Sequence, residues 1–298
     1  MKERTILVIN GGSSSVKFPL FNQSHCEIAS GLAERLGAPG AQLTINAEGK
    51  KQTYSFPDAK HAIVVNSLID TLIEMKLLDD GLGGIGHRVV HGGEYFAESV
   101  AITAEVIDKI ASCNHLASRQ NPANVLGIQI LQQRFPHLPQ VAVFDTAFHQ
   151  TIVKHAYIYG LPYAYYRDLG LWRYGFHGTS HCYDAEQAIE RLQLNRNDNA
   201  VISAHLGNGC NVAAVRNGRS VDTSMGLTPL EGLLMGTRCG DVDPSVHHFL
   251  VQQLNIDLTE VTHILNTKVA CWVLRASAMI CAHSVRPRPR ATSERRWR

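Results

Sequence analysis

The stretch between His205 and Asp241 contains glycines and polar side chains at a spacing that suits an anion. Glycines at the end of a strand let the backbone take positive φ and bring N–H groups close to a phosphate. The pattern predicts a strand-turn-strand phosphate cradle, although an ordinary hairpin with solvated turns fits it equally well. The expected strands cover 201–204, 211–215 and 219–222, with turns at Gly207-Asn208-Gly209 and Asn217-Gly218.

One arginine, Arg238, lies between Gly236 and Gly240 in the second half of this stretch. A guanidinium group on a glycine-rich loop is suited to a bidentate grip on phosphate or carboxylate.

The N-terminal segment contains a second small-residue turn between two expected strands. An apolar run from Thr5 ends at Asn10 and continues as Asn-Gly-Gly-Ser-Ser-Ser-Val-Lys-Phe through residue 18, which brings Lys17 to a small-residue turn. Two such loops in corresponding places predict a duplicated nucleotide-binding domain. Neither loop is a Walker A or a Gly-x-Gly-x-x-Gly motif.

Two further charged residues follow apolar strand-like runs. Arg88 lies in 85–90, and Asp145 follows 141–144. Ligands of α/β sheets gather at the carboxyl ends of strands. A buried arginine is costly unless paired, so we favour carboxylate or phosphate binding by Arg88 over a structural ion pair. Asp145 suits acid-base chemistry or, more simply, the orientation of an arginine.

Helical segments are expected between these strands. The run 61–77 has apolar residues at helical spacing, and Asn121-Pro122 and Asp243-Pro244 mark helix starts by a cap and a proline. We expect these helices to reach Phe135 and Leu254, and we expect 174–181 to form a glycine-flanked turn. The expected core contacts of the first helix are Ile63, Leu68, Ile69, Leu72 and Ile73.

Composition limits the function classes. The 298 residues carry a net charge of +2, but seven arginines and one glutamate after Lys268 give that tail +6 and leave −4 for the rest. A mildly acidic body predicts no specific nucleic-acid partner. No run approaches membrane-span length, and seven scattered cysteines are typical of reduced thiols. We therefore expect a cytoplasmic protein that binds no membrane.

Five motifs resemble the acetate/propionate kinase family in order and spacing, over residues 1 to about 268. The resemblance implies an α/β fold of two related actin-like, sugar-kinase-like (ribonuclease-H-like) domains with a central cleft. The implied domains are 1–149 and an incomplete 150–268, followed by a non-family Arg/Pro-rich tail, 269–298, without regular structure. The motifs are Asn-x-Gly-Ser-Ser-Ser-x-Lys-Phe at 10–18, Gly-His-Arg-Val-Val-His-Gly-Gly at 86–93, Phe-Asp-Thr-Ala-Phe-His at 144–149, Tyr-Gly-Phe-His-Gly-Thr-Ser-His at 174–181, and 205–241.

The resemblance also implies an activity, the reversible transfer of the ATP γ-phosphoryl group to acetate or propionate with Mg²⁺, which gives an acyl phosphate and ADP in a homodimeric enzyme. Such a transfer needs positioning and charge neutralisation. The implied catalytic residues are Asp145, His177 and Arg238, and Arg88 would bind the substrate carboxylate. The other implied residues are Val90, Phe176 and Pro229 for the acyl pocket, Asn10 for the metal, and Ser13, Ser15, Lys17, His205, Leu206, Gly207, Asn208 and Gly209 for ATP.

Departures from the family pattern leave alternatives open. Arg119 and Gln120 replace a leucine and a histidine, Gly11 and Cys239 replace a cysteine and a serine, and Pro19 falls within an expected strand. The leading alternative is a non-catalytic truncated remnant of such a kinase. A second is an anion- or nucleic-acid-binding protein that uses the arginine-rich tail. A His/Asp-assisted hydrolase is disfavoured, because no serine occupies a nucleophile elbow.

The tail from Val269 onward is predicted to be the product of a frameshift. Reading one base earlier, Cys271-Trp272-Val273 encodes Leu-Gly whichever codons are used, and Met279-Ile280 encodes an aspartate, in accord with the family pattern. Sequencing the gene tests this. Restoring one base near Lys268 should open a frame that encodes Gly-Gly-Ile-Gly-Glu-Asn and Asn-Glu-Glu, and the absence of such a frame would refute the prediction.

Overall fold

The computed structural model describes residues 4–12, 14–56, 60–78, 81–118 and 120–269. The expectations for Ser13, Arg119 and the tail beyond Val269 lie outside these residues. Two compact units divide the chain. The first comprises residues 1–204 with 212–229, and the second comprises 205–211 with 230–298. The domain boundaries expected from the resemblance stay a prediction.

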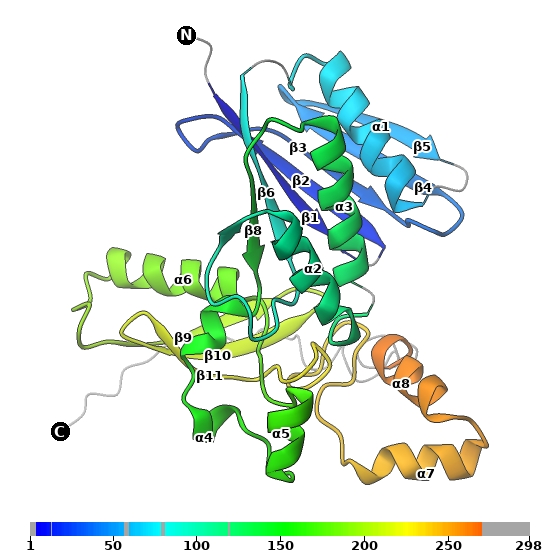
Figure 1. Ribbon diagram of the computed structural model, residues 1–298, viewed down its shortest axis with the longest axis vertical. Helices are drawn as coiled ribbons and strands as arrows, with labels where there is room; N and C mark the ends of the chain where they lie inside the picture. Colours follow the sequence, from blue (N-terminus) through cyan, green and yellow to red (C-terminus); the bar gives the residue numbers. More distant parts are fainter. Residues whose placement is uncertain (1–3, 13, 57–59, 79–80, 119, 270–298) are drawn as a thin grey trace, which may run out of the picture. The chain divides into compact units, whose positions relative to one another are not determined.

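An eight-stranded sheet dominates the first unit, in the order β5-β4-β3-β2-β1-β6-β8-β7 (Figure 1). The strands β1 to β5 form an antiparallel meander in which each strand pairs with the next along the chain. The bounds are β1 (Thr5–Gly11), β2 (Ser15–Phe21), β3 (Glu27–Glu34), β4 (Ala41–Ala47), β5 (Lys50–Phe56), β6 (Leu82–Val89), β7 (Val100–Ala101) and β8 (Gln140–Phe144).

Three neighbouring strands of this sheet, β1, β6 and β8, are parallel. β6 pairs in parallel with β1 on one side and with β8 on the other. Asn10 lies opposite Arg88 in the first pair, and Val89 lies opposite Phe144 in the second. Parallel strands present their carboxyl ends at one edge, so Asn10, Arg88 and Asp145 are brought to the same edge of the sheet.

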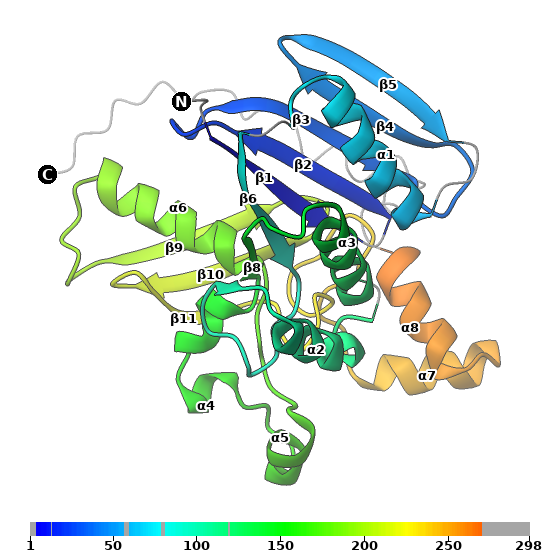
Figure 2. The same ribbon diagram turned by 45° about the horizontal axis from the view of Figure 1, so that its top comes forward.

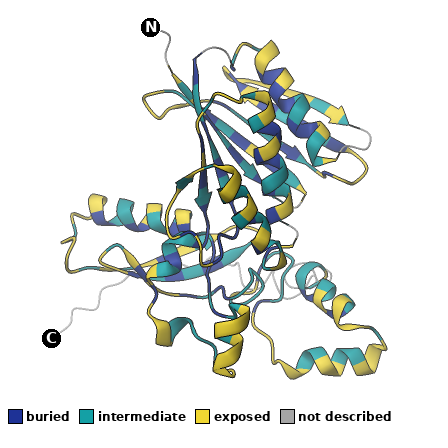
Figure 3. Ribbon diagram, in the orientation of Figure 1, coloured by how far each residue is buried: buried dark blue, intermediate teal, exposed yellow. Residues whose placement is uncertain are grey.

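Two helices, α1 (His61–Glu74) and α3 (Asn121–Arg134), pack side by side on one face of the sheet (Figures 1 and 2). The buried positions on the facing sides of the sheet and helices form one apolar core (Figure 3). Leu68, Ile69 and Leu72 of α1 belong to this core and are almost fully buried. The predicted helix is therefore confirmed for its inner face.

Ile63 and Ile73 were also expected in the core, and this expectation is wrong. Their side chains are 53% and 41% exposed. Both therefore lie outside the packed face of α1. The helix also ends at Glu74, before the predicted limit of residue 77.

β2 continues through Pro19, which pairs opposite Ser30 of β3. The missing N–H of this proline does not interrupt the strand. The neighbouring residues Phe18 and Leu20 are nearly fully buried in the core, and their burial stabilises the extended backbone on both sides.

The remainder of the first unit includes a smaller sheet in the order β11-β10-β9. A hairpin turn at Asn217-Gly218, with φ of 52° and 73°, joins β10 to β11, as predicted. The bounds are α2 (Ala104–Ser112), η1 (Cys113–His115), η2 (Ala147–Thr151), α4 (Lys154–Tyr157), α5 (Tyr163–Leu169), α6 (Gly178–Arg191), β9 (Ala200–Leu206), β10 (Cys210–Arg216) and β11 (Arg219–Thr223).

The second unit contains α7 (Ser245–Leu254) and α8 (Leu258–Thr267), which pack against each other. Asp257 caps α8, because its carboxylate accepts a hydrogen bond from the Glu260 backbone N–H at 2.8 Å. The predicted helix before Leu254 is confirmed as α7. None of the helices among the described residues has the length and apolar character needed to span a membrane.

Replacing Leu68 with alanine should lower the free energy of unfolding by about 2–5 kcal/mol, because the change leaves a cavity in a packed core. Ile63→Ala on the same helix is the matched control and should cost less than about 1 kcal/mol, because this side chain is half exposed. Urea unfolding of both variants measures the difference. Equal losses would contradict the assignment of the inner and outer faces of α1.

Candidate active site

Three polar side chains meet where the parallel strands end. The Arg88 guanidinium donates from Nε to Asp145 Oδ1 at 2.8 Å and from Nη2 to Asp145 Oδ2 at 2.6 Å. Its Nη1 donates to Asn10 Oδ1 at 2.9 Å. The Asp145 side chain is only 2% exposed, whereas that of Arg88 is 33% exposed. A buried carboxylate is therefore neutralised by an arginine that still reaches solvent.

The ion pair determines the charge state of Arg88. Burial alone lowers the pKa of the Arg88 guanidinium, but the charge and hydrogen bonds of Asp145 outweigh it and raise the pKa above its ordinary value. Arg88 thus makes an ion pair with Asp145, while its binding of a carboxylate or phosphate and the acid-base or orienting role of Asp145 stay predictions. The three hydrogen bonds use three of the five N–H donors of arginine, so two remain for an anionic ligand.

His177 lies at the beginning of α6 with a left-handed backbone, φ 55°. The next residue, Gly178, donates its N–H to the Asp145 carbonyl at 2.8 Å, which connects the start of α6 to the end of β8. A Cβ on Gly178 would overlap with that carbonyl oxygen, so only glycine allows this approach. The N-terminus of a helix favours anions, and His177 directly precedes the first residue of α6.

The expected turn at 174–181 is correct only in its first part, because α6 already begins at Gly178. His181 is fully buried inside the first turns of α6, and its Nδ1 is 3.0 Å from Ser203 Oγ. His181 therefore connects α6 to Ser203 of β9.

His149 is a further buried histidine, which the sequence analysis did not single out. Its Nε2 lies 3.0 Å from the Phe176 carbonyl, the backbone group that directly precedes His177, and its Nδ1 lies 2.8 Å from Ser220 Oγ. Burial lowers the pKa of His149 to about 4, so the ring is neutral at neutral pH. The sequence feature that could have identified His149 is its place as the last residue of the motif at 144–149.

Asn121 was interpreted as a helix cap, and this is wrong. Gln120 is the N-cap residue of α3, and no side chain caps the helix there. The fully buried Asn121 instead accepts from the His91 backbone N–H at 3.0 Å and donates to the His91 carbonyl at 2.9 Å. The Asn121 side chain thus fixes the backbone of the segment that follows β6. The Asn-Pro pattern predicts a helix start but not this contact.

The three residues expected to line the acyl pocket are Val90, Phe176 and Pro229. Val90 and Phe176 are buried. The His91 ring, next to Val90, packs edge-on against Phe176 with 5.5 Å between ring centroids. Pro229 is half-buried on the loop after β11, and its part in a pocket stays a prediction.

The N-terminal loop brings Lys17 beside the site. Lys17 lies directly opposite Asn10 in the antiparallel pair of β1 and β2, so both side chains share one face. The loop closes through the Gly12 N–H, which donates to the Ser15 carbonyl at 2.7 Å. An exposed ammonium group near Asn10 is available to a phosphate.

The positive φ that we expected from the glycines of both loops is absent. Gly11, Gly12, Gly207 and Gly209 are not among the described glycines with positive φ. Close approach favours a small residue at the first loop, because a Cβ on Gly11 would lie 3.2 Å from Asn124 Nδ2. The small residues thus make room for neighbouring groups.

The second unit contains the loop expected to bind ATP. His205 and Leu206 end β9, and Gly207 donates its N–H to the Gly209 carbonyl at 3.2 Å. The Asn208 carbonyl accepts from the Gly236 N–H at 3.1 Å, so the cradle and the Arg238 loop are joined within this unit.

Arg238 is located on a turn of the same unit, in which the Met235 N–H donates to the Arg238 carbonyl at 3.1 Å. Burial lowers the pKa of the Arg238 guanidinium, although the nearby Cys210 opposes this shift. A partly desolvated guanidinium binds an anion more strongly than an exposed one.

A magnesium ion would find an oxygen donor in the side chain of Asn10, a hard ligand of the kind that it prefers. Among the described residues no group of three or more His, Cys, Asp or Glu is placed to hold a metal. Mg²⁺ is commonly bound through one or two protein oxygens, with substrate phosphates and waters as its other ligands. The Asn10 oxygen would suit such an ion when phosphates and waters supply its other ligands.

Comparisons with known proteins define the class of this chain. It is 48% identical over 270 residues to an acetate kinase of Agathobacter rectalis, covering 88% of this chain and 68% of the relative. It is 48% identical to one of Desulfitobacterium hafniense, covering 92% and 70%. A propionate kinase structure from Francisella tularensis superposes with a TM-score of 0.87 at 44% identity, over 95% of this chain and 75% of the other. Acetate kinase of Porphyromonas gingivalis gives a TM-score of 0.83 at 42% identity, over 92% and 70%.

These relatives are phosphotransferases that use a carboxyl group as acceptor, and their structures have the actin-like two-domain α/β fold. The fold class predicted from the sequence is thus confirmed. The chain belongs to the acetokinase family, whose model matches residues 5–279 and so extends past Lys268.

Three histidines near the site should make the protein less stable in acid. Burial lowers the pKa of His87, His91 and His149 from 6.5 to about 4. Between these values the unfolded chain binds protons that the folded chain does not, so stability should fall as pH decreases from 6.5 towards 4. The loss should reach about 1.4 kcal/mol per pH unit for each histidine.

Urea unfolding across this range tests the prediction. His87→Gln, in which an amide replaces the ring that contacts Gln140 at 2.8 Å, should show a weaker pH dependence. An unfolding free energy that does not change between about pH 7 and pH 5 would contradict it.

Proposed function

We propose that this chain transfers the γ-phosphoryl group of ATP to acetate or propionate, forming an acyl phosphate and ADP in a reversible reaction. The observation that carries the proposal is the contact of Arg88 with Asp145 and Asn10 at the ends of three parallel strands. The names of the relatives support the substrate class, acetate for several curated proteins and propionate for a solved structure.

The substrate carboxylate would bind to the two N–H donors that Arg88 does not use within the protein. Asp145 keeps the guanidinium plane fixed, because both of its oxygens accept from the same arginine. A fixed fork of donors orients a carboxylate oxygen for in-line attack on phosphorus, and such positioning lowers the entropic part of the barrier. The apolar side chains of Val90, Phe176 and Pro229 would accommodate the short acyl chain.

Charge on the transferring phosphoryl group would be stabilised by His177 at the start of α6 and by Arg238. Lys17, Ser13, Ser15 and the loop from His205 to Gly209 would hold the other phosphates of ATP. Mg²⁺, held by Asn10 and the phosphates, would neutralise further charge. Hydrogen bonds and charges that are already in place before the reaction stabilise its transition state at little reorganisation cost.

We further propose that the protein acts in the cytoplasm and forms homodimers. A non-catalytic remnant, the alternative left open by the sequence, is not favoured by the family match. A measurement of catalytic turnover decides between an active kinase and a non-catalytic remnant.

Arg88→Ala and Arg238→Ala should each reduce kcat/KM for acetate phosphorylation about 10²- to 10³-fold, because each removes a charge placed at the transition state. A coupled assay of ADP release with acetate and with propionate measures the change. Arg196→Ala is the matched control, because this arginine pairs with Glu186 on the surface of α6 and should leave the rate unchanged.

Full turnover in either site variant would contradict the assigned roles. Absence of ADP release from the unmodified chain with both acids would support the non-catalytic alternative.

A further inference from the structure

The parallel pairing of β1 and β6 stops one residue before their connecting loops. The last matched pair is Asn10 with Arg88. Beyond it the Gly11 carbonyl and the Val90 N–H no longer bond directly to each other across the two strands. Buried backbone groups at such a point need other partners.

Asn124, on the first turn of α3, supplies both partners. Its Nδ2 donates to the Gly11 carbonyl at 2.7 Å, and its Oδ1 accepts from the Val90 N–H at 3.1 Å. The side chain is almost fully buried, at 4% exposure. A carboxamide has the same donor and acceptor as a peptide group, so Asn124 continues the hydrogen-bonded ladder between two strands that have separated.

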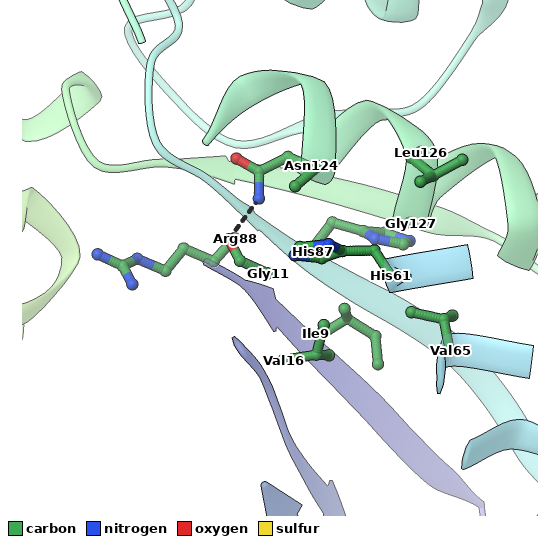
Figure 4. Close-up of a pocket in the computed structure, with 11 residues that line it drawn as sticks. Ile9, Gly11, Val16, His61, Val65, His87, Arg88, Asn124, Leu126 and Gly127 are labelled. Carbon is green, nitrogen blue, oxygen red and sulfur yellow. Dashed lines mark hydrogen bonds between the residues drawn. The ribbon is translucent and has the colours of Figure 1, made fainter. Parts of the chain in front are cut away.

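Figure 4 shows the Asn124 amide above Gly11, beside the cavity lined by His61, His87 and Arg88. The imidazole of His61 lies 2.9 Å from the Gly12 carbonyl, so the next residue of the loop is held as well. A Cβ on Gly11 would lie only 3.2 Å from Asn124 Nδ2. The loop at Gly11 and Gly12 is therefore in close contact with Asn124 of α3 and with His61 of α1.

Only an asparagine meets these requirements. Alanine would leave both backbone groups without a partner, and glutamine is one methylene too long for a site this closely packed. Aspartate has the right shape and could still accept from the Val90 N–H, but it would oppose the Gly11 carbonyl with another acceptor. Asn124→Asp thus breaks one contact and keeps the other.

We propose that Asn124 is a positioning residue for phosphoryl transfer, a role that rests on the proposed function. By joining Gly11 to Val90 it fixes the separation of Asn10, on the nucleotide and metal side, from Arg88 and Val90, on the carboxylate side. Small displacements of reacting groups are costly, about 10²-fold in rate for a misplacement of about 1 Å. Asn124 touches neither substrate itself.

Steady-state kinetics of Asn124→Asp provide the first test. Severing the Gly11 contact should lower kcat about tenfold or more and raise KM for MgATP, while KM for acetate stays within about twofold. Asn124→Ala, which severs both contacts, should raise KM for acetate as well. Ile130→Val on the same helix is the control for lost stability and should leave kcat and both KM values unchanged.

A second readout does not depend on activity. The Arg88 Nε–H signal in ¹⁵N NMR reports the geometry of its bonds to Asp145 and, through the same guanidinium, to Asn10. This signal should move in Asn124→Asp and keep its position in Ile130→Val.

The outcomes separate the two proposals. If Asn124→Asp changed only the melting temperature, with kinetics and Arg88 signal like those of Ile130→Val, the positioning role would be overturned. If the unmodified chain turned over neither acetate nor propionate, the proposed function would fail. In that case a displaced Arg88 signal in Asn124→Asp would still support the positioning of Arg88, and an unchanged one would refute it.

Discussion

Parallel pairing of β1, β6 and β8 is the constraint on which the site depends. The pairing runs the three strands in one direction, so their last residues share one edge of the sheet. Arg88 would be costly at a largely buried position without a partner, and the adjacent strand supplies Asp145 at its end. The ion pair and the sheet are therefore mutually dependent. Removing Arg88 would leave the buried charge of Asp145 without its partner.

The strand ends also create a need for hydrogen bonds that the sheet no longer provides. Side chains from α3 and from buried histidines meet this need at several places. Asn121 pairs with the backbone of His91, Asn124 with Gly11 and Val90, and His149 lies against the Phe176 carbonyl. Since these polar groups are buried and neutral, they support the site without adding charge to it. The side chains of the candidate site thus rest on elements held by side-chain to backbone hydrogen bonds.

Much of this arrangement could be predicted from the sequence. Apolar runs and glycine turns located the strands that end at Asn10, Arg88 and Asp145, because strand periodicity and turn chemistry are local signals. Burial was harder: Ile63 and Ile73 follow the helical period of α1 and yet face outward, since the period does not say how wide the covered face is. The roles of Asn121 and Asn124 depend on contacts as far as 113 residues away in the chain, which no local pattern contains.

The topology of the large sheet has a consequence for how the chain folds. Strands β1 to β5 pair with their neighbours along the chain, so this meander can form through short loops. The contacts of the site join residues that are far apart in the sequence, because Arg88 bonds to residues 78 and 57 positions away. Closing such long loops costs entropy that local contacts do not. Binding competence should therefore arise late in folding, after the meander has formed, and partial opening that parts β6 from β1 would abolish it while most of the secondary structure remains.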